Sequence, residues 1–182
     1  MPPVTHFLRI IGVAATVATA GATFAGPRGV APEPSVRSAH AIAWHAGLER
    51  VVMYGGMTRG GPDADVLWAY DGKHWEPHRD SPNPGRRAHF AFAYDAARDR
   101  LLVHGGFRAE GRVITDRFAD TWAWDQDGWH LLDSDGFGPR DHHAMACDTE
   151  RREVVLFGGG DSTGVMPPGT WAWNGESWLS LI

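Results

Sequence analysis

The sequence has a single cysteine, no strongly basic stretch and no long uninterrupted hydrophobic run. Because Cys147 is alone, an intramolecular disulfide is excluded, and cysteine usage does not indicate the redox compartment. A formal net charge of −5 argues against nucleic acid as the main partner, since short basic pairs such as Arg86-Arg87 read as solvated surface. The apolar stretch over residues 10–25 is short and interrupted by glycine, which argues against a membrane-spanning helix.

Residues 1–25 instead have the character of a signal peptide for export. A single positive charge precedes the apolar stretch, and small-residue cleavage sites end at Ala20, Ala22 or Ala25. We expect the protein to be secreted or periplasmic, with a disordered tail, an uncleaved anchor and a cytoplasmic location as the alternatives. Residues 26–36 are rich in proline and glycine and are expected to form a stiff linker.

The rest of the chain repeats one pattern three times. In each repeat an arginine stands eighteen residues before a pair of glycines that ends a hydrophobic run, and an aromatic-Ala-aromatic triplet and a last tryptophan follow. A period of about fifty residues built from strands and turns is typical of propeller blades. The repeated positions are Arg37, Arg87, Arg140, Gly55, Gly56, Gly105, Gly106, Gly158, Gly159, Trp68, Trp122, Trp171, Trp75, Trp129 and Trp178.

Each repeat is predicted to form four short antiparallel strands. The first strand alternates large residues with alanine, so one of its faces is bulky and the other is small. The second strand is the apolar run, which fits a strand covered on both faces in a stack of sheets. Tight hairpins between the third and fourth strands are predicted by Asp71-Gly72, Asp127-Gly128 and Asn174-Gly175. The short turns therefore gather at one end of the strands and the long, divergent loops at the other, an arrangement typical of recognition.

The order Arg-x-x-His, apolar run ending in Gly-Gly and tryptophan-containing strand resembles the kelch-repeat β-propellers, which include the propeller domain of galactose oxidase. The resemblance covers residues 34–182 and departs from the family pattern at Phe90, where the other repeats have His40 and His143. It implies an all-β fold in which residues 37–182 form three four-stranded antiparallel kelch-type blades. The blades are expected over about residues 37–80, 87–133 and 140–182.

Three blades are fewer than a closed propeller needs. Such rings hold about 4–8 blades, and an open row of three would expose an apolar face at each end. We therefore hypothesise that the ring is incomplete in one chain and that two chains form a homodimer closing one six-bladed ring. The alternative is a fragment or a degenerate gene product.

No catalytic constellation is recognisable in the sequence. His142 and His143 are adjacent on a predicted strand and point to opposite faces, so they do not readily share a metal ion. The copper-radical chemistry that the family resemblance brings to mind needs a tyrosine crosslinked to cysteine, whereas Tyr54, Tyr70 and Tyr94 occupy core positions of the repeats. We expect no enzyme activity, no metal and no cofactor. A degenerate galactose-oxidase-like or glycan-acting enzyme and a purely structural protein are the alternatives.

The resemblance implies a binding platform, because kelch propellers mostly bind other molecules. We expect a protein or a carbohydrate ligand to meet the long loops. The tryptophans are expected in the core, because they recur at fixed repeat positions, and the three repeat arginines are expected to bond strand ends or to ring a channel mouth. The candidate ligand-binding residues, chosen by loop position alone, are Met57, Arg59, Arg108, Glu110, Arg112 and Asp161.

Overall fold

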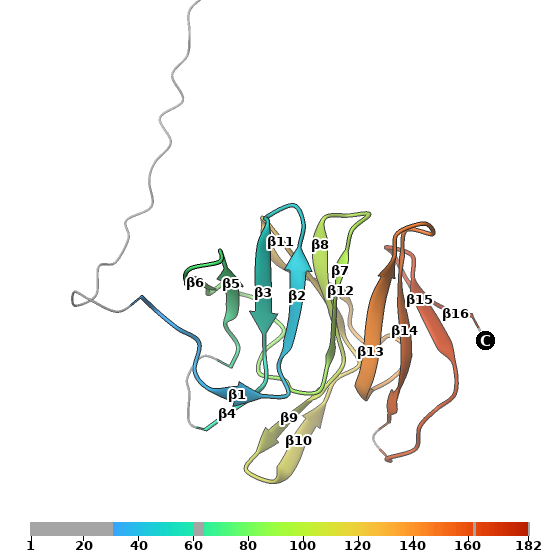
Figure 1. The fold of residues 1–182 in the computed structure, drawn as a ribbon. Coiled ribbons are helices and arrows are strands. Elements are labelled where there is room, and N and C mark those ends of the chain that lie inside the picture. The colour runs from blue at the N-terminus through green and yellow to red at the C-terminus, as the bar shows by residue number, and fades with distance from the viewer. Residues whose placement is uncertain (1–30, 60–63, 162, 182) are drawn as a thin grey trace, which may run out of the picture. The chain divides into compact units, whose positions relative to one another are not determined.

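The computed structural model describes residues 31–59, 64–161 and 163–181, and the regular structure in these ranges is entirely β (Figure 1). The predicted signal peptide, its cleavage sites and the first part of the predicted linker lie outside the described residues. Among the described residues, none forms a helix that is both long and apolar enough to cross a membrane. The prediction of an all-β chain is confirmed.

Three four-stranded antiparallel sheets dominate the fold, and in each one strands adjacent in sequence are adjacent in the sheet. The first sheet consists of β2 (Ala41–His45), β3 (Arg50–Tyr54), β5 (Leu67–Tyr70) and β6 (Trp75–His78). The second consists of β7 (Ala91–Asp95), β8 (Arg100–His104), β11 (Thr121–Asp125) and β12 (Gly128–Asp133). The third consists of β13 (Asp141–Asp148), β14 (Glu153–Gly160), β15 (Thr170–Trp173) and β16 (Trp178–Ser180).

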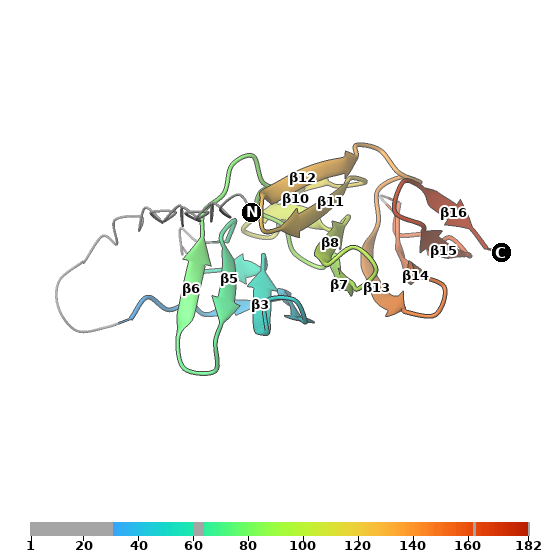
Figure 2. The same ribbon diagram turned by 90° about the horizontal axis from the view of Figure 1, so that it is seen from above.

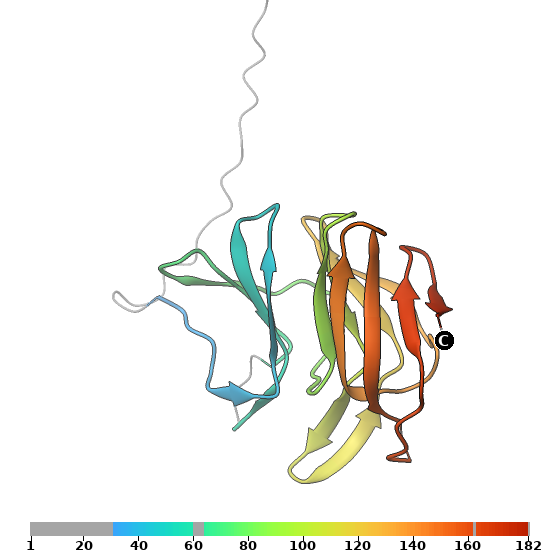
Figure 3. The same cartoon turned by 45° about the vertical axis from the view of Figure 1, so that its right-hand side comes forward.

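The three sheets follow one another in chain order, as the view from above and the turned view both show (Figures 2 and 3). Their first strands are neighbours, since β7 contacts both β2 and β13. This arrangement is compatible with a β-propeller, but the sheets that the structure describes do not form a closed ring. The first and third sheets therefore each keep one face without a neighbouring sheet.

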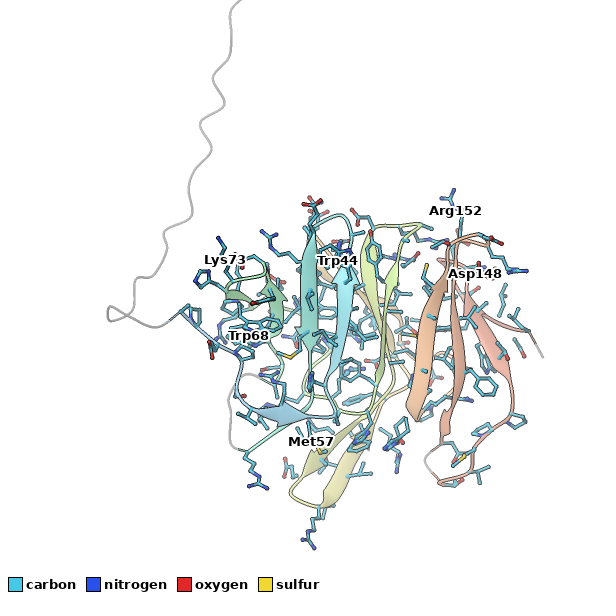
Figure 4. The ribbon with its side chains drawn as sticks, viewed as in Figure 1. Trp44, Met57, Trp68, Lys73, Asp148 and Arg152 are labelled. Atoms are coloured by element: carbon cyan, nitrogen blue, oxygen red, sulfur yellow. The ribbon has the colours of Figure 1, made fainter. Side chains whose placement is uncertain are left out.

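Two short two-stranded sheets lie outside the three large ones. Strand β1 (Arg37–Ser38) pairs with β4 (Met57–Thr58), and β9 (Phe107–Glu110) pairs with β10 (Val113–Arg117). Both lie at the end opposite the short turns that carry Lys73 and Arg152, and Met57 is labelled there (Figure 4). We call this end the loop end.

Each sheet has a bulky face and a small face, because alanine alternates with large residues along its first strand. Residues directly opposite each other on neighbouring strands point to the same side of the sheet. On the small face of the first sheet, Ala41 pairs with Tyr54 and Ala43 with Val52. On the bulky face of the second, Phe92 pairs with Val103 and Tyr94 with Leu101. These two faces pack together in one core cluster. The alternation of alanine with large residues in the first strand of each repeat thus decides which side of a sheet accepts its neighbour.

The second junction is built in the same way. Ala93 and Ala123, on the small face of the second sheet, pack with Val154, Trp173 and half-buried Met145 of the third. The middle sheet is therefore covered on both sides, and Leu101, Leu102 and Val103 of β8 are fully buried. Burial of each such side chain contributes about 1.5–3 kcal/mol, so β8 is the most strongly fixed strand of the core.

Backbone hydrogen bonds repeat across both junctions. The amide of Gly56 donates to the carbonyl of Arg87 over 2.8 Å, and the amide of Gly106 donates to the carbonyl of Arg140 over the same distance. Within each repeat, the arginine guanidinium also donates to the carbonyl of the first glycine of the doublet. These bonds are Arg37 to Gly55 (3.0 Å), Arg87 to Gly105 (3.0 Å) and Arg140 to Gly158 (2.8 Å).

A candidate binding groove at the loop end

A groove of about 420 Å³ opens at the loop end between the two short two-stranded sheets. Its walls come from β1 and β4 on one side and from β9 and the turn after it on the other, and its floor comes from the start of the second repeat. The lining residues are Ser38, Gly56, Met57, Thr58, Arg59, Ala64, Arg86, Arg87, Ala88, Phe107, Arg108, Ala109, Glu110 and Gly111.

The floor holds the β9 wall in place through its backbone. Ala88 and Phe107 exchange both hydrogen bonds of an antiparallel bridge, with lengths of 2.8 and 3.0 Å. Gly111 then turns the hairpin with a φ of 61°, a conformation that glycine adopts without steric cost. The position of β9 therefore depends on these backbone bonds together with the buried side chain of Phe107, whose ring stacks on His89 with centroids 5.2 Å apart.

The Arg87 side chain lies under the groove, where its bonds to neighbouring groups hold the floor in place and leave it unavailable to a ligand. Its buried guanidinium forms two hydrogen bonds with Asp120, of 2.7 and 3.0 Å, and donates to the carbonyl oxygens of Gly105 and Pro84. It also stacks 4.2 Å from the ring centroid of Phe118. An arginine with so many partners is a structural group.

The remaining charges of the groove are exposed. Arg108 pairs with Asp116 over 2.6 Å, although both side chains remain largely exposed. Arg59 and Arg86 are exposed and form no ion pair with any residue that the structure describes. Glu110 is the single acidic side chain in the lining. The groove thus presents two guanidinium groups that pair with no acid among the described residues, and its positive character contrasts with the net negative charge of the chain.

Four of the six loop residues selected from the sequence line this groove: Met57, Arg59, Arg108 and Glu110. Arg112, at the tip of the β9–β10 hairpin, is exposed but is not part of the lining. Asp161 lies elsewhere, where its carboxylate accepts hydrogen bonds from the backbone and hydroxyl of Thr163 and from the amide of Val165. These bonds lower the pKa of Asp161, and they stabilise the loop in which it lies.

The sequence reasoning missed the contribution of Arg86. It treated Arg86-Arg87 as solvated surface, whereas the two side chains separate, one into the core and the other onto the groove. The signal available in the sequence was that Arg87 is a repeat position and Arg86 is not.

The histidines divide between the core and the surface. His143 is buried against His104, with ring centroids 5.4 Å apart, and neither of its ring nitrogens has a hydrogen-bond partner in the structure. Burial, reinforced by Arg140, lowers the pKa of His143 to about 4. Burial also lowers the pKa of His104 well below its usual range. His142 points outward beside Asp141. Across residues 31–59, 64–161 and 163–181, no three His, Cys, Asp or Glu side chains gather as metal ligands.

Trp44 differs from the expectation that the tryptophans are core residues, because its side chain is 54% exposed. Trp68, Trp124, Trp129 and Trp173 are buried, and the other repeat tryptophans are half-buried. Trp44 lies on the bulky face of the first sheet, which no neighbouring sheet covers (Figure 4). Its exposure reflects the missing neighbour, since Tyr94 at the equivalent position of the second repeat packs against the first sheet.

No protein-family model matches the chain, and no curated protein matches it.

Proposed function

We propose that the chain is an exported, non-catalytic binding module built from three kelch-like propeller blades, one per sheet. The meander order of each sheet supports the blade assignment, as does the repeated bond from arginine to the first glycine of the doublet. The groove at the loop end is the proposed binding site, and its ligand is an acidic segment of a partner protein.

The observation that carries this proposal is the pair of exposed arginines, Arg59 and Arg86, on one concave surface. A volume of 420 Å³ lies within the range of about 300–1,000 Å³ that is usual for ligand sites. Guanidinium groups bind carboxylates in bidentate pairs, and such charge-assisted hydrogen bonds are about twice as strong as neutral ones. An acidic peptide is the ligand chemistry that these two groups select.

A peptide fits the lining better than a glycan does. Sugar rings stack on exposed aromatic faces, but the one aromatic residue of the lining, Phe107, is buried. The lining also offers backbone groups, alanine side chains, the partly exposed Met57 and the side chains of Ser38 and Thr58, which suit an extended peptide with small or apolar residues between its acids. Glu110 would repel a uniformly acidic chain at one wall, so spaced acids are preferred over a continuous run.

A binding measurement with single-charge variants tests the proposal. Fluorescent peptides with spaced aspartates, and uronic-acid oligosaccharides as the glycan probe, are titrated with the full chain, with Arg59→Ala and with Arg86→Ala. The control is Lys73→Ala, which removes one exposed positive charge at the opposite end (Figure 4).

We expect each arginine variant to weaken peptide binding about tenfold, the effect of losing one charge-assisted hydrogen bond, and Lys73→Ala to leave it unchanged. Equal binding by all four proteins would refute the site. Binding of the oligosaccharide alone, with the same dependence on the arginines, would refute the peptide and leave a glycan-binding function.

A further inference from the structure

The two junctions between sheets repeat one arrangement of aromatic side chains. Tyr54, which precedes the first glycine doublet, lies 5.9 Å from Phe90 and 4.8 Å from Trp129, measured between ring centroids. In the second junction, His104 lies 5.4 Å from His143 and 5.2 Å from Trp178. The residue before the glycine doublet is therefore buried each time by two positions of the next repeat.

The third repeat has the residue before the glycine doublet, Phe157, but no following repeat among the described residues to cover it. Phe157 stands where Tyr54 and His104 stand, but it is 66% exposed, whereas those two are fully buried. The positions that would cover it are occupied in the first repeat by His40, which is exposed, and by Trp75, which is half-buried. One chain thus contains both halves of a third junction, separated onto its two outer sheets.

The first glycine of each doublet shows the same difference: at two doublets a backbone carbonyl of the next repeat lies against it, and at the third none does. A Cβ atom on Gly55 or Gly105 would collide with the carbonyl oxygen of the next repeat's arginine, Arg87 or Arg140. At Gly158, a Cβ would meet nothing within 4 Å. All three glycines have positive φ, between 64° and 80°, so their local geometry is alike and only the neighbouring carbonyl is missing. The carbonyl of Arg37 occupies the equivalent position in the first repeat.

The free faces also match in shape. The bulky face of the first sheet exposes Ile42 (56%) and Trp44 (54%). At the equivalent positions of the other repeats, Phe92, Tyr94 and Met145 pack on the small face of the preceding sheet. The small face of the third sheet exposes Ala144 and Ala146, the equivalents of Ala41 and Ala43. A bulky face that meets an alanine face is how both internal junctions are packed.

From these observations we infer that a second copy of this chain covers both faces. The first sheet of each copy packs on the third sheet of the other, with Phe157 against His40 and Trp75, and with the Arg37 carbonyl over Gly158. Two such junctions close a ring of six sheets, which lies within the usual range of about 4–8 for propellers. A head-to-tail contact that closes after two copies leaves no apolar face exposed, whereas an open contact would form filaments.

The test is sedimentation equilibrium of the full chain with three variants. Phe157→Asp places a charge in both junctions, and Ile42→Asp does so from the opposite face. Val113→Asp is the matched control, because Val113 of β10 is also 66% exposed but lies on neither face. All three side chains are largely exposed in one chain, so the substitutions leave its fold intact, as circular dichroism checks.

We expect the full chain and Val113→Asp to have twice the mass of one chain. Phe157→Asp and Ile42→Asp should each weaken association about 30-fold or more, because each removes a buried anchor. Mixing these two variants should restore association, since the mixed pair keeps one junction with both faces unchanged.

Three results would overturn the inference: a full chain that remains monomeric, a Phe157→Asp protein that associates like the full chain, or a mixture that does not recover. The last would indicate like faces in contact. Peptide binding at the loop end does not use these faces, so its outcome is separate from this one.

Discussion

Replacing His143 by phenylalanine should remove a large part of the acid sensitivity of the fold. His143 is buried, neither of its ring nitrogens is hydrogen-bonded in the structure, and phenylalanine already occupies the equivalent position, Phe90. Desolvation lowers its pKa to about 4 in the folded chain, whereas the unfolded value is 6.5. The substitution therefore removes a titrating group from the core and keeps an aromatic ring at this position.

Proton linkage determines how the free energy of unfolding changes with pH. Between pH 6.5 and about 4 the unfolded chain binds a proton at this histidine and the folded chain does not, so the free energy of unfolding falls as the pH falls. A depression of this size corresponds to about 3 kcal/mol, nearly all of it lost by pH 4. Below that pH both states are protonated and the contribution to the slope ends.

Urea unfolding, monitored by tryptophan fluorescence, measures the free energy of unfolding at several pH values between 7 and 4. The stability of His143→Phe relative to the unmodified chain should rise by about 3 kcal/mol over that range. His74→Phe, at an exposed turn, controls for the replacement of a histidine by phenylalanine in general. A difference between His143→Phe and the unmodified chain that stays constant with pH would refute the assignment of a neutral buried His143.

Two further substitutions test the junctions, and urea unfolding is the measurement for both. Arg87→Met should cost about 3–5 kcal/mol, because it leaves the Asp120 carboxylate without its buried partner, and a cost below about 1 kcal/mol would contradict the structural role of Arg87. Gly105→Ala should destabilise the chain more than Gly158→Ala, because only the former adds a collision with the Arg140 carbonyl to the strain of positive φ, and equal costs would contradict the junction geometry.

Periodicity predicted the strands well because it reports local chemistry. The alternation of alanine with large residues in Ala41–His45 and Ala91–Asp95 predicts both a strand and which face accepts a neighbour, and the structure has strands at both places. The Asp127-Gly128 turn likewise lies where β11 ends and β12 begins. All three features are determined by residues adjacent in sequence.

The loop end could not be predicted in the same way. No Asn-Gly or Asp-Gly pair marks the β9–β10 hairpin, whose turn is Gly111-Arg112. Its position depends on the bridge from Phe107 to Ala88, at the start of the same repeat. The sequence predicted an exposed apolar face at each end of an open row of three sheets. It did not single out Trp44, because equivalent repeat positions have the same pattern whether or not a sheet lies beside them. Both features depend on contacts between segments distant in sequence.

Cross-linking of a cysteine pair tests most directly whether the two free faces are halves of one junction. In a chain with Cys147→Ala, cysteines replace His40 and Phe157, and a short bifunctional maleimide is added. We predict rapid formation of a covalent dimer, because ring centroids at the equivalent internal pairs are 5.9 and 5.4 Å apart. Cross-linking no faster than in a control chain with cysteines at positions 113 and 157 would contradict the account.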